Sequence, residues 1–345
     1  MALLDIRNLT IEIETPQGWV KAVDKFNLTL SDGEIRGLVG ESGSGKSLVA
    51  ETIVGIAKKT WHVTADRLHF DNIDLLSLSP AERRRIMGRD IAMVFQEPSS
   101  CLDPSEKIGA QLKEAMPARQ IGKGGSWLQR RNWQHWHWKH WNWRHKEAVS
   151  LLHRVGIRDS REVINAYPFE LSEGECQKVM IAMAIANQPR LLIADEPTNA
   201  LEASNQAQIL RQLERINKLS GTTILLISND LTTFAQLTNN ITVMYCGQAV
   251  ESGSREQVLN TPHHPYTAAL LQMMPDLDGS LPHKARLNTL PGAIPPLQSL
   301  PIGCRLGPRC PNAQKKCVQT PPLAKYKGQS YYCHFPLNMP EPKTK

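Results

Sequence analysis

The segment EIRGLVGESGSGKS at residues 34–47 constrains the fold more than any other part of the sequence. A short apolar run, expected to form a strand, leads directly into a stretch that matches G-x-x-x-x-G-K-[ST] at every fixed position. The following SLVAETIVGIA has the pattern of a helix. Glycines in such a loop let backbone N–H groups surround phosphate oxygens, and the helix N-terminus adds a favourable dipole. The segment therefore predicts a phosphate-binding loop for a nucleotide.

Each part of this loop has an expected role. Lys46 would reach the outer phosphates, and the hydroxyl of Ser47 would coordinate Mg²⁺. The cofactors expected from the loop are therefore ATP and Mg²⁺. The nucleotide contacts that we predict here are Gly40, Glu41, Ser42, Gly43, Ser44, Gly45, Lys46, Ser47 and Leu48.

A second apolar run, in RLLIADEP, ends in the acidic pair Asp195 and Glu196. An aspartate at the end of such a strand holds Mg²⁺ in P-loop ATPases, and the adjacent glutamate is placed to polarise the attacking water. The alternative is a solvated helix cap, which the phosphate-binding loop makes less favourable. TTILLIS at 222–228 predicts a third buried strand. Apolar runs that alternate with helical patterns indicate an α/β protein, a sheet covered by helices.

The order of GESGSGKS, VFQEP, LSEGECQ and LLIADEPTNALE resembles the ATPases of ABC transporters. The flanking VFQEPSSCLDP, HHPYTAALL and LPIGCRLGPRC resemble, more narrowly, the ATPases of oligopeptide and dipeptide importers. The resemblance covers nearly the whole chain. It implies a P-loop NTPase with a RecA-like core, an N-terminal antiparallel β subdomain, a helical subdomain and a small Cys/Pro-rich C-terminal extension. We expect the nucleotide-binding domain at 1–260, its helical subdomain at about 98–180, and the extension at 261–345.

The same resemblance assigns roles to residues outside the loop. Gln96, in VFQEP, would sense Mg²⁺ and nucleotide and link the site to the transmembrane partner. Ser172 and Gly174, in LSEGECQ, would contact ATP held by the opposite ATPase subunit. Trp19 is the candidate for stacking on adenine. Glu196 remains the expected catalytic base.

Three positions depart from the family pattern. Glu173 replaces a glycine of the signature, Glu202 replaces an aspartate, and Asn229 replaces the switch histidine. That histidine usually donates a hydrogen bond to the γ-phosphate, and asparagine can donate one too, but it is shorter and carries no positive charge. Losing one transition-state donor typically costs about 10²–10³ in rate. We expect a weakened site. A compensated, tolerated variation and a regulatory subunit that does not hydrolyse ATP are the alternatives.

Four cysteines near the C-terminus follow the spacing C-x5-C-x6-C-x15-C. Four thiolates suit either tetrahedral zinc or an iron–sulfur cluster, and structural zinc usually has closely spaced cysteine pairs, which are missing here. A [4Fe-4S] cluster is favoured, and the importer resemblance implies the same. Zinc and simple packing without metal are the alternatives. The proline-rich TLPGAIPPLQSLPIGC predicts an extended connection to this module. The proposed ligands are Cys304, Cys310, Cys317 and Cys333.

The stretch WQHWHWKHWNW at 133–143 lies in a Trp/His-rich insertion at 127–145. Residues 122–146 carry six basic residues and no acid, so they hold +6 of the formal +7 of the chain. A zinc site from His135, His137 and His140 and a grip on single-stranded nucleic acid are the less favoured hypotheses. The tryptophans form no single helical stripe. A surface loop and an interfacial patch at lipid headgroups or the permease are the favoured ones.

The sequence contains no run of eighteen apolar residues, and its start lacks the features of a secretory signal. With the resemblance, this predicts a peripheral protein on the cytoplasmic side of the inner membrane. The implied partners are two permease subunits, a second homologous ATPase and, indirectly, a periplasmic substrate-binding protein, with no nucleic acid. Peptides, and in particular cationic ones, are the implied cargo. A soluble ABC ATPase acting on DNA or ribosomes is the rival, but the chain has one motif set and no heptad run.

Overall fold

The computed structural model describes residues 2–116, 133–199, 201–273 and 290–339, with the side chains of residues 133–142 outside that description. The chain divides into two compact units. The first unit joins the N-terminal residues Met1–Leu78 to the C-terminal residues Thr223–Lys345, and the second comprises Ser79–Thr222.

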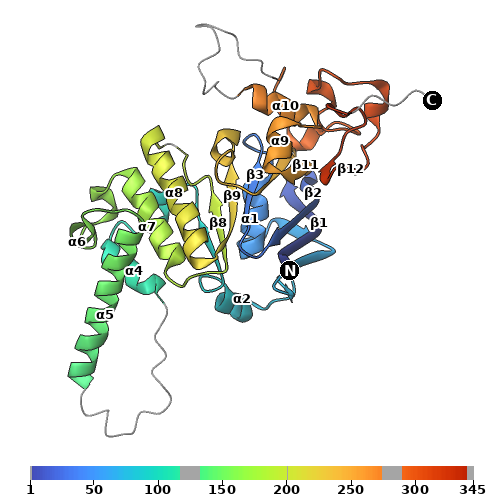
Figure 1. Ribbon diagram of the computed structural model, residues 1–345. Helices are drawn as coiled ribbons and strands as arrows, with labels where there is room; N and C mark the ends of the chain where they lie inside the picture. The colour runs from blue at the N-terminus through green and yellow to red at the C-terminus, as the bar shows by residue number, and fades with distance from the viewer. Residues whose placement is uncertain (1, 117–132, 200, 274–289, 340–345) are drawn as a thin grey trace. The chain divides into compact units, whose positions relative to one another are not determined.

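An antiparallel sheet forms the N-terminal part of the first unit (Figure 1). β1 and β2 form a long hairpin in which Thr15 pairs with Gly18, and β1 also pairs with β4 and β5. Apolar side chains such as Leu4, Ile6 and Phe26 are fully buried there. The predicted antiparallel β subdomain is therefore confirmed. Its strands are β1 (Ala2–Thr15), β2 (Gly18–Ser31), β4 (Trp61–Thr64), β5 (Arg67–Phe70) and β6 (Ile73–Asp74).

A second sheet of the first unit carries the predicted phosphate-binding loop. β3 lies between β9 and β10 and is parallel to both, and these central strands are almost entirely buried and mostly apolar, as parallel strands usually are. β11 pairs antiparallel with β10, and the C-terminal strands β13 and β12 add to β11. The strands are β3 (Ile35–Val39), β9 (Thr223–Ser228), β10 (Asn240–Tyr245), β11 (Gln248–Ser254), β12 (Ala324–Tyr326) and β13 (Gln329–Tyr331).

A buried carboxylate joins the C-terminal extension to this sheet. Glu251 of β11 is 1% exposed and accepts hydrogen bonds from the backbone N–H of His263 (2.6 Å) and His264 (3.1 Å) and from Nε2 of Gln329 (2.6 Å). Burial raises the pKa of Glu251.

The helical elements of the first unit are α1 (Lys46–Val54), η3 (Leu231–Phe234), α9 (Arg255–Asn260), α10 (Pro265–Gln272), η4 (Leu297–Ser299), η5 (Gly307–Arg309) and η6 (Lys315–Val318).

The second unit combines one parallel strand pair, β7 with β8, and a group of helices. Helix α7 packs against α3, α4 and α5. Its elements are α2 (Pro80–Ile86), β7 (Ile91–Val94), α3 (Pro98–Cys101), α4 (Ile108–Ala115), α5 (Trp133–Arg154), α6 (Ser160–Val163), η2 (Pro168–Glu170), α7 (Glu173–Ile185), β8 (Leu191–Asp195) and α8 (Ala203–Ser220).

The Trp/His-rich stretch forms the first half of α5, so the hypothesis of a surface loop is wrong for residues 133–143 (Figure 1). The second half of the helix accounts for its formation. Ala148, Leu151 and Leu152 of the helix, with Val155 directly after it, recur at helical spacing and are at most 1% exposed, so they bury one face. The part of the insertion at 127–132 lies outside the described residues.

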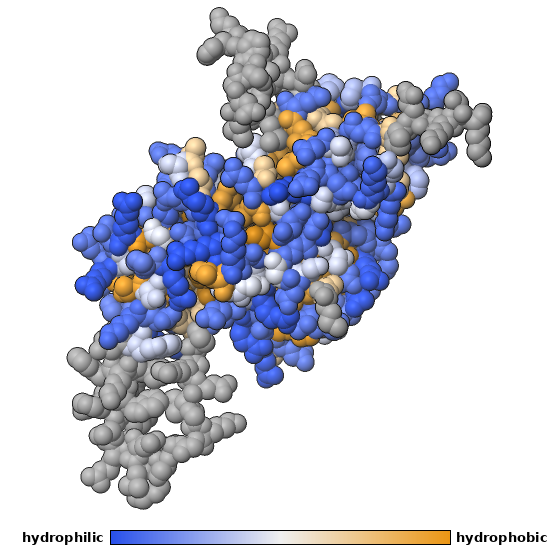
Figure 2. All heavy atoms as spheres, in the orientation of Figure 1, coloured by the Kyte–Doolittle hydropathy of each residue, from blue (hydrophilic) through white to orange (hydrophobic). Residues whose placement is uncertain are grey.

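Most side chains visible in Figure 2 are hydrophilic. Over the part of the chain that the structure describes, no helix has the length and apolar character of a membrane span.

Candidate functional site

The predicted phosphate-binding loop connects β3 to α1 in the first unit. Val39 pairs with Ser228 on one side and with Val243 on the other, so the loop leaves the sheet where β9 and β10 also end. Gly40 is required there, because a Cβ atom would lie 2.0 Å from the carbonyl oxygen of Met244. Gly45 has φ 102°, a left-handed conformation that favours glycine. The glycine pattern therefore has a steric cause.

Lys46 lies inside this loop and is 3% exposed. Its ammonium donates to the carbonyl oxygens of Gly40 (2.8 Å) and Glu41 (3.1 Å) and to Oγ of Ser44 (3.4 Å). It also donates to Oδ1 of Asn229 at 2.6 Å. A buried ammonium needs such oxygen partners, and they fix the lysine at the centre of the loop. The predicted position of Lys46 thus has the geometry of a site for anionic oxygens.

Asn229, predicted to replace a switch histidine, is the residue immediately after β9. Because Val39 and Ser228 are paired, Asn229 stands beside Gly40 at the same end of the sheet. Its Oδ1 accepts from Lys46, which leaves Nδ2 as the group with which this side chain can donate. The structure therefore brings together Lys46 and Asn229, as a site for phosphate oxygens requires.

Trp19 lies in β2 close to the turn of the first hairpin and is 55% exposed. Its ring is in edge contact with the imidazole of His62, with centroids 6.2 Å apart. An exposed aromatic face is compatible with stacking on a base. The role of Trp19 in adenine binding stays a prediction.

In the second unit, parallel pairing explains how Gln96 and Glu196 meet. Val94 of β7 pairs with Ala194 of β8. Gln96 comes two positions after Val94, and Glu196 comes two positions after Ala194. Nε2 of Gln96 donates to Oε2 of Glu196 at 2.8 Å, and Nδ2 of Asn199 donates to the same oxygen at 3.3 Å. Glu196 is 8% exposed and Asp195 is 3% exposed. The two predicted acids therefore sit in a mostly buried polar cluster.

The signature stretch LSEGECQ forms the start of α7, with Ser172 as its N-cap. Oγ of Ser172 accepts from the N–H of Glu175 (3.4 Å), and Oε2 of Glu175 accepts from the N–H of Ser172 (2.9 Å), a capping box. Gly174 is buried, but a Cβ would come no closer than 3.4 Å to Asn205, an ordinary contact. Glu173 is exposed in the first helical turn, where a negative charge is favourable. The departure at Glu173 thus has a local structural explanation.

The four C-terminal cysteines all lie within the described residues 290–339. Burial raises the pKa of the Cys304 and Cys310 thiols and raises that of Cys333 to about 11, and neighbouring thiols contribute to each increase. However, the described residues contain no group of three His, Cys, Asp or Glu side chains placed to hold a metal ion. The predicted [4Fe-4S] cluster is therefore unsupported by this geometry, and so is the zinc alternative.

Two contacts of the phosphate-binding loop, both made by Glu41, were not predicted. The Glu41 side chain, expected near nucleotide, is bound by Arg309, which stands 268 residues later in the C-terminal extension. The backbone N–H of Glu41 also donates to the hydroxyl of Tyr266 at 2.9 Å. Tyr266 lies in HHPYTAALL and Arg309 in LPIGCRLGPRC, but neither stretch indicates a contact with the loop, because only the fold brings them there.

Comparison with known families fits this geometry. The family described as ABC transporter matches residues 23–199, and the family described as oligopeptide/dipeptide transporter, C-terminal region, matches residues 250–317. The chain therefore belongs to the ABC transporter family of ATP-binding proteins, a family of ATPases. The dimeric structure of a bacterial ABC transporter cassette has the same fold, with a TM-score of 0.60 at 25% identity, covering 73% of this chain and 98% of that chain.

Individual relatives narrow the comparison to peptide transport. The peptide transport system ATP-binding protein SapD of Salmonella typhimurium is 58% identical over 98% of this chain and 99% of its own length. SapD of Haemophilus influenzae is 52% identical over 100% of this chain and 95% of its own. The dipeptide transport ATP-binding protein DppD of Escherichia coli is 39% identical over 98% of both chains.

Proposed function

We propose that this chain is the ATP-hydrolysing subunit of an inner-membrane ABC importer for peptides, with cationic peptides as its cargo. The observation that carries the proposal is the similarity to SapD proteins over essentially the full length of both chains. The geometry of Lys46 in one unit and of Gln96 with Glu196 in the other supports it. The chain would lie peripherally on the cytoplasmic side of the inner membrane and drive two permease subunits.

In this proposal the predicted residues act on one Mg-ATP. Gly40 to Leu48 surround the phosphates, with Trp19 against the adenine. Ser47, Gln96 and Asp195 hold Mg²⁺, which would stabilise negative charge on the phosphates. Glu196 accepts a proton from the attacking water, and its carboxylate is oriented for this by the amides of Gln96 and Asn199. Ser172 and Gly174 face the ATP of a second, homologous ATPase subunit.

The test of the proposal is purification of the intact membrane complex. We expect two permease proteins to co-purify, and we expect reconstituted vesicles to take up a cationic peptide only with ATP. Glu196→Gln removes the general base, so it should lower turnover by about 10²–10⁴-fold while Mg-ATP still binds. Uptake that continues unchanged with Glu196→Gln, or a chain that purifies without permeases, would contradict the proposal.

The signature role of Ser172 can be separated from its role as a helix cap. Ser79 caps α2 in a capping box of nearly the same geometry, with Glu82 Oε2 3.0 Å from the N–H of Ser79. Ser79→Ala and Ser172→Ala should each cost about 0.5–2 kcal/mol of stability. Only Ser172→Ala should lower ATPase activity of the assembled complex, by roughly 10- to 100-fold, because it removes a hydrogen bond to a charged phosphate. Equal activity of the two variants would exclude a contact between Ser172 and ATP.

Asn229 is proposed to slow hydrolysis at this chain's own site without abolishing it. It keeps the contact with Lys46 and one amide donor, but it cannot carry the positive charge of an imidazolium. Asn229→His should therefore raise the single-turnover rate of hydrolysis in the assembled complex. The increase should be smaller than the roughly 10²–10³-fold change in rate that follows from losing one transition-state donor completely. Asn229→Ala should lower it. Identical rates for the Asn229→His variant and the unmodified chain would refute the weakening. Nothing in the described residues favours a purely regulatory subunit.

A [4Fe-4S] cluster on Cys304, Cys310, Cys317 and Cys333 is proposed separately. The backbone N–H of Cys304 donates to the carbonyl oxygen of Cys317 at 2.9 Å, which supports it by bringing two of the cysteines together, while the described residues show no complete ligand set. Protein purified without oxygen should be brown and contain iron and sulfide, and Cys310→Ser should remove the colour. Cys101→Ser is the control, because Cys101 is exposed and distant in sequence from the motif. Colourless protein without iron would refute the cluster.

A further inference from the structure

The segment CRLGPRC, which is Cys304 to Cys310, carries two arginines that pair with carboxylates from the N-terminal part of the first unit. Nη2 of Arg305 lies 2.7 Å from Oδ2 of Asp24, and Nη1 of Arg309 lies 2.8 Å from Oε2 of Glu41. The side chains of Arg305 and Arg309 are 10% and 8% exposed. The two pairs are alike in chemistry and burial, but only Glu41 belongs to the phosphate-binding loop.

The pair with Glu41 is the more elaborate of the two. Nη2 of Arg309 lies 3.2 Å from Oε1 of Glu41, so the guanidinium binds both carboxylate oxygens. Nε of Arg309 donates to the carbonyl of Pro291 at 3.1 Å, and Nη1 also donates to the hydroxyl of Tyr245 at 3.3 Å. The pairing with Glu41 raises the pKa of Arg309, and a guanidinium is in any case charged at physiological pH. Arg309 is therefore fixed on both sides, toward the loop and toward the extension.

Glu41 uses every polar group of its backbone to shape the loop. Its N–H donates to Tyr266, and its carbonyl oxygen accepts from the N–H of Ser44 (3.1 Å) and from Lys46 (3.1 Å). Rotating the Glu41 backbone would therefore move the carbonyl that holds the Lys46 ammonium. Arg309 restrains this residue through its side chain.

Charge gives Arg309 a second effect on the loop. Glu41 is an anion in a loop proposed to bind the polyphosphate of ATP, and like charges at short range repel. The guanidinium compensates that charge in a partly buried setting, where screening by water is reduced. Without Arg309, the Glu41 carboxylate would be left uncompensated beside the phosphates.

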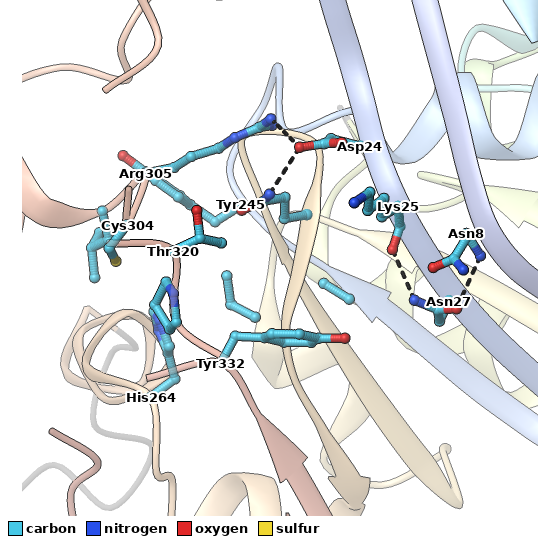
Figure 3. A pocket seen from close by; sticks show the side chains of 15 residues that line it. Asn8, Asp24, Lys25, Asn27, Tyr245, His264, Cys304, Arg305, Thr320 and Tyr332 are labelled. Carbon is cyan, nitrogen blue, oxygen red and sulfur yellow. Dashed lines mark hydrogen bonds and ion pairs between the residues drawn. The ribbon is translucent and has the colours of Figure 1, made fainter. Parts of the chain in front are cut away.

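Figure 3 shows the pocket around Arg305, which we use as the matched comparison for Arg309. Arg305 extends along the side of a cavity of about 170 Å³ and reaches Asp24 of β2, which also accepts from Nε2 of Gln248 at 3.1 Å. It donates as well to the carbonyl oxygen of Cys246. Arg305 thus attaches the same segment to the same unit without touching the phosphate-binding loop.

We propose that Arg309 of the C-terminal extension is a positioning residue for ATP, which orients and neutralises Glu41 so that the phosphate-binding loop accepts the nucleotide. This inference rests on the proposed ATP site. It makes the affinity for nucleotide depend on a segment outside the motifs that define the ATPase. It also assigns Glu41 a structural role in the loop through its side chain, in place of a direct contact with ATP.

The experiment compares Mg-ATP binding by calorimetry across four full-length proteins: the unmodified chain, Arg309→Gln, Arg305→Gln and the double variant Arg309→Gln with Glu41→Gln. Arg309→Gln should raise Kd by between about 5- and 150-fold, the usual range for coupling between sites. The double variant, which leaves no uncompensated charge, should recover most of that loss. Arg305→Gln should lower the unfolding temperature but change Kd by less than about threefold.

The outcomes separate the inference from the proposed function. An unmodified chain that does not bind Mg-ATP would refute the function itself. Equal weakening by Arg305→Gln and Arg309→Gln would mean that the extension only stabilises the fold, and would overturn the role of Arg309. Unchanged affinity in Arg309→Gln, or failure of Glu41→Gln to restore it, would do the same. If Arg309→Gln unfolds, Arg309→Lys keeps the charge without the bidentate geometry and should bind with intermediate affinity.

Discussion

The phosphate-binding loop depends on the hydrogen bonds between the buried ammonium of Lys46 and the oxygen atoms around it. A charge that is 3% exposed must be surrounded by oxygen atoms, and here these come from the loop itself and from Asn229 after β9. The parallel pairing of Val39 with Ser228 brings those two sources to one end of the sheet. The strand order, the glycines and the helix start can therefore be understood as one arrangement that holds this lysine.

Local sequence predicted the elements whose causes are local. The strand before Gly40, the helix that starts at Lys46 and the strand ending at Asp195 all follow from apolar runs or helical patterns within a few positions. The meeting of Gln96 and Glu196 was also accessible in principle. Each follows its strand by the same number of residues, so parallel pairing alone aligns them.

Prediction from sequence failed where a structural feature depends on residues far away along the chain. The tryptophans of 133–143 form no stripe, yet the segment is helical because α5 is anchored by Ala148, Leu151 and Leu152 further along. The pair of Glu41 with Arg309 joins residues 268 positions apart and has no periodic signature. Cysteine spacing alone cannot decide the metal site either, because spacing along the chain does not determine whether turns direct three thiols to one point, and the described residues show no such group.

The partners of the phosphate-binding loop also have a consequence for the order in which this chain is made. β3 and α1 end by residue 54, but β9 and β10, Tyr266 and Arg309 all lie beyond residue 222. During synthesis, the loop therefore leaves the ribosome long before the strands that flank it and the side chains that fix Glu41. Nucleotide can stabilise only a nearly finished protein, since a ligand stabilises the state that holds its site. Elements whose partners are close in sequence, such as the β1–β2 hairpin, can pair earlier and without nucleotide.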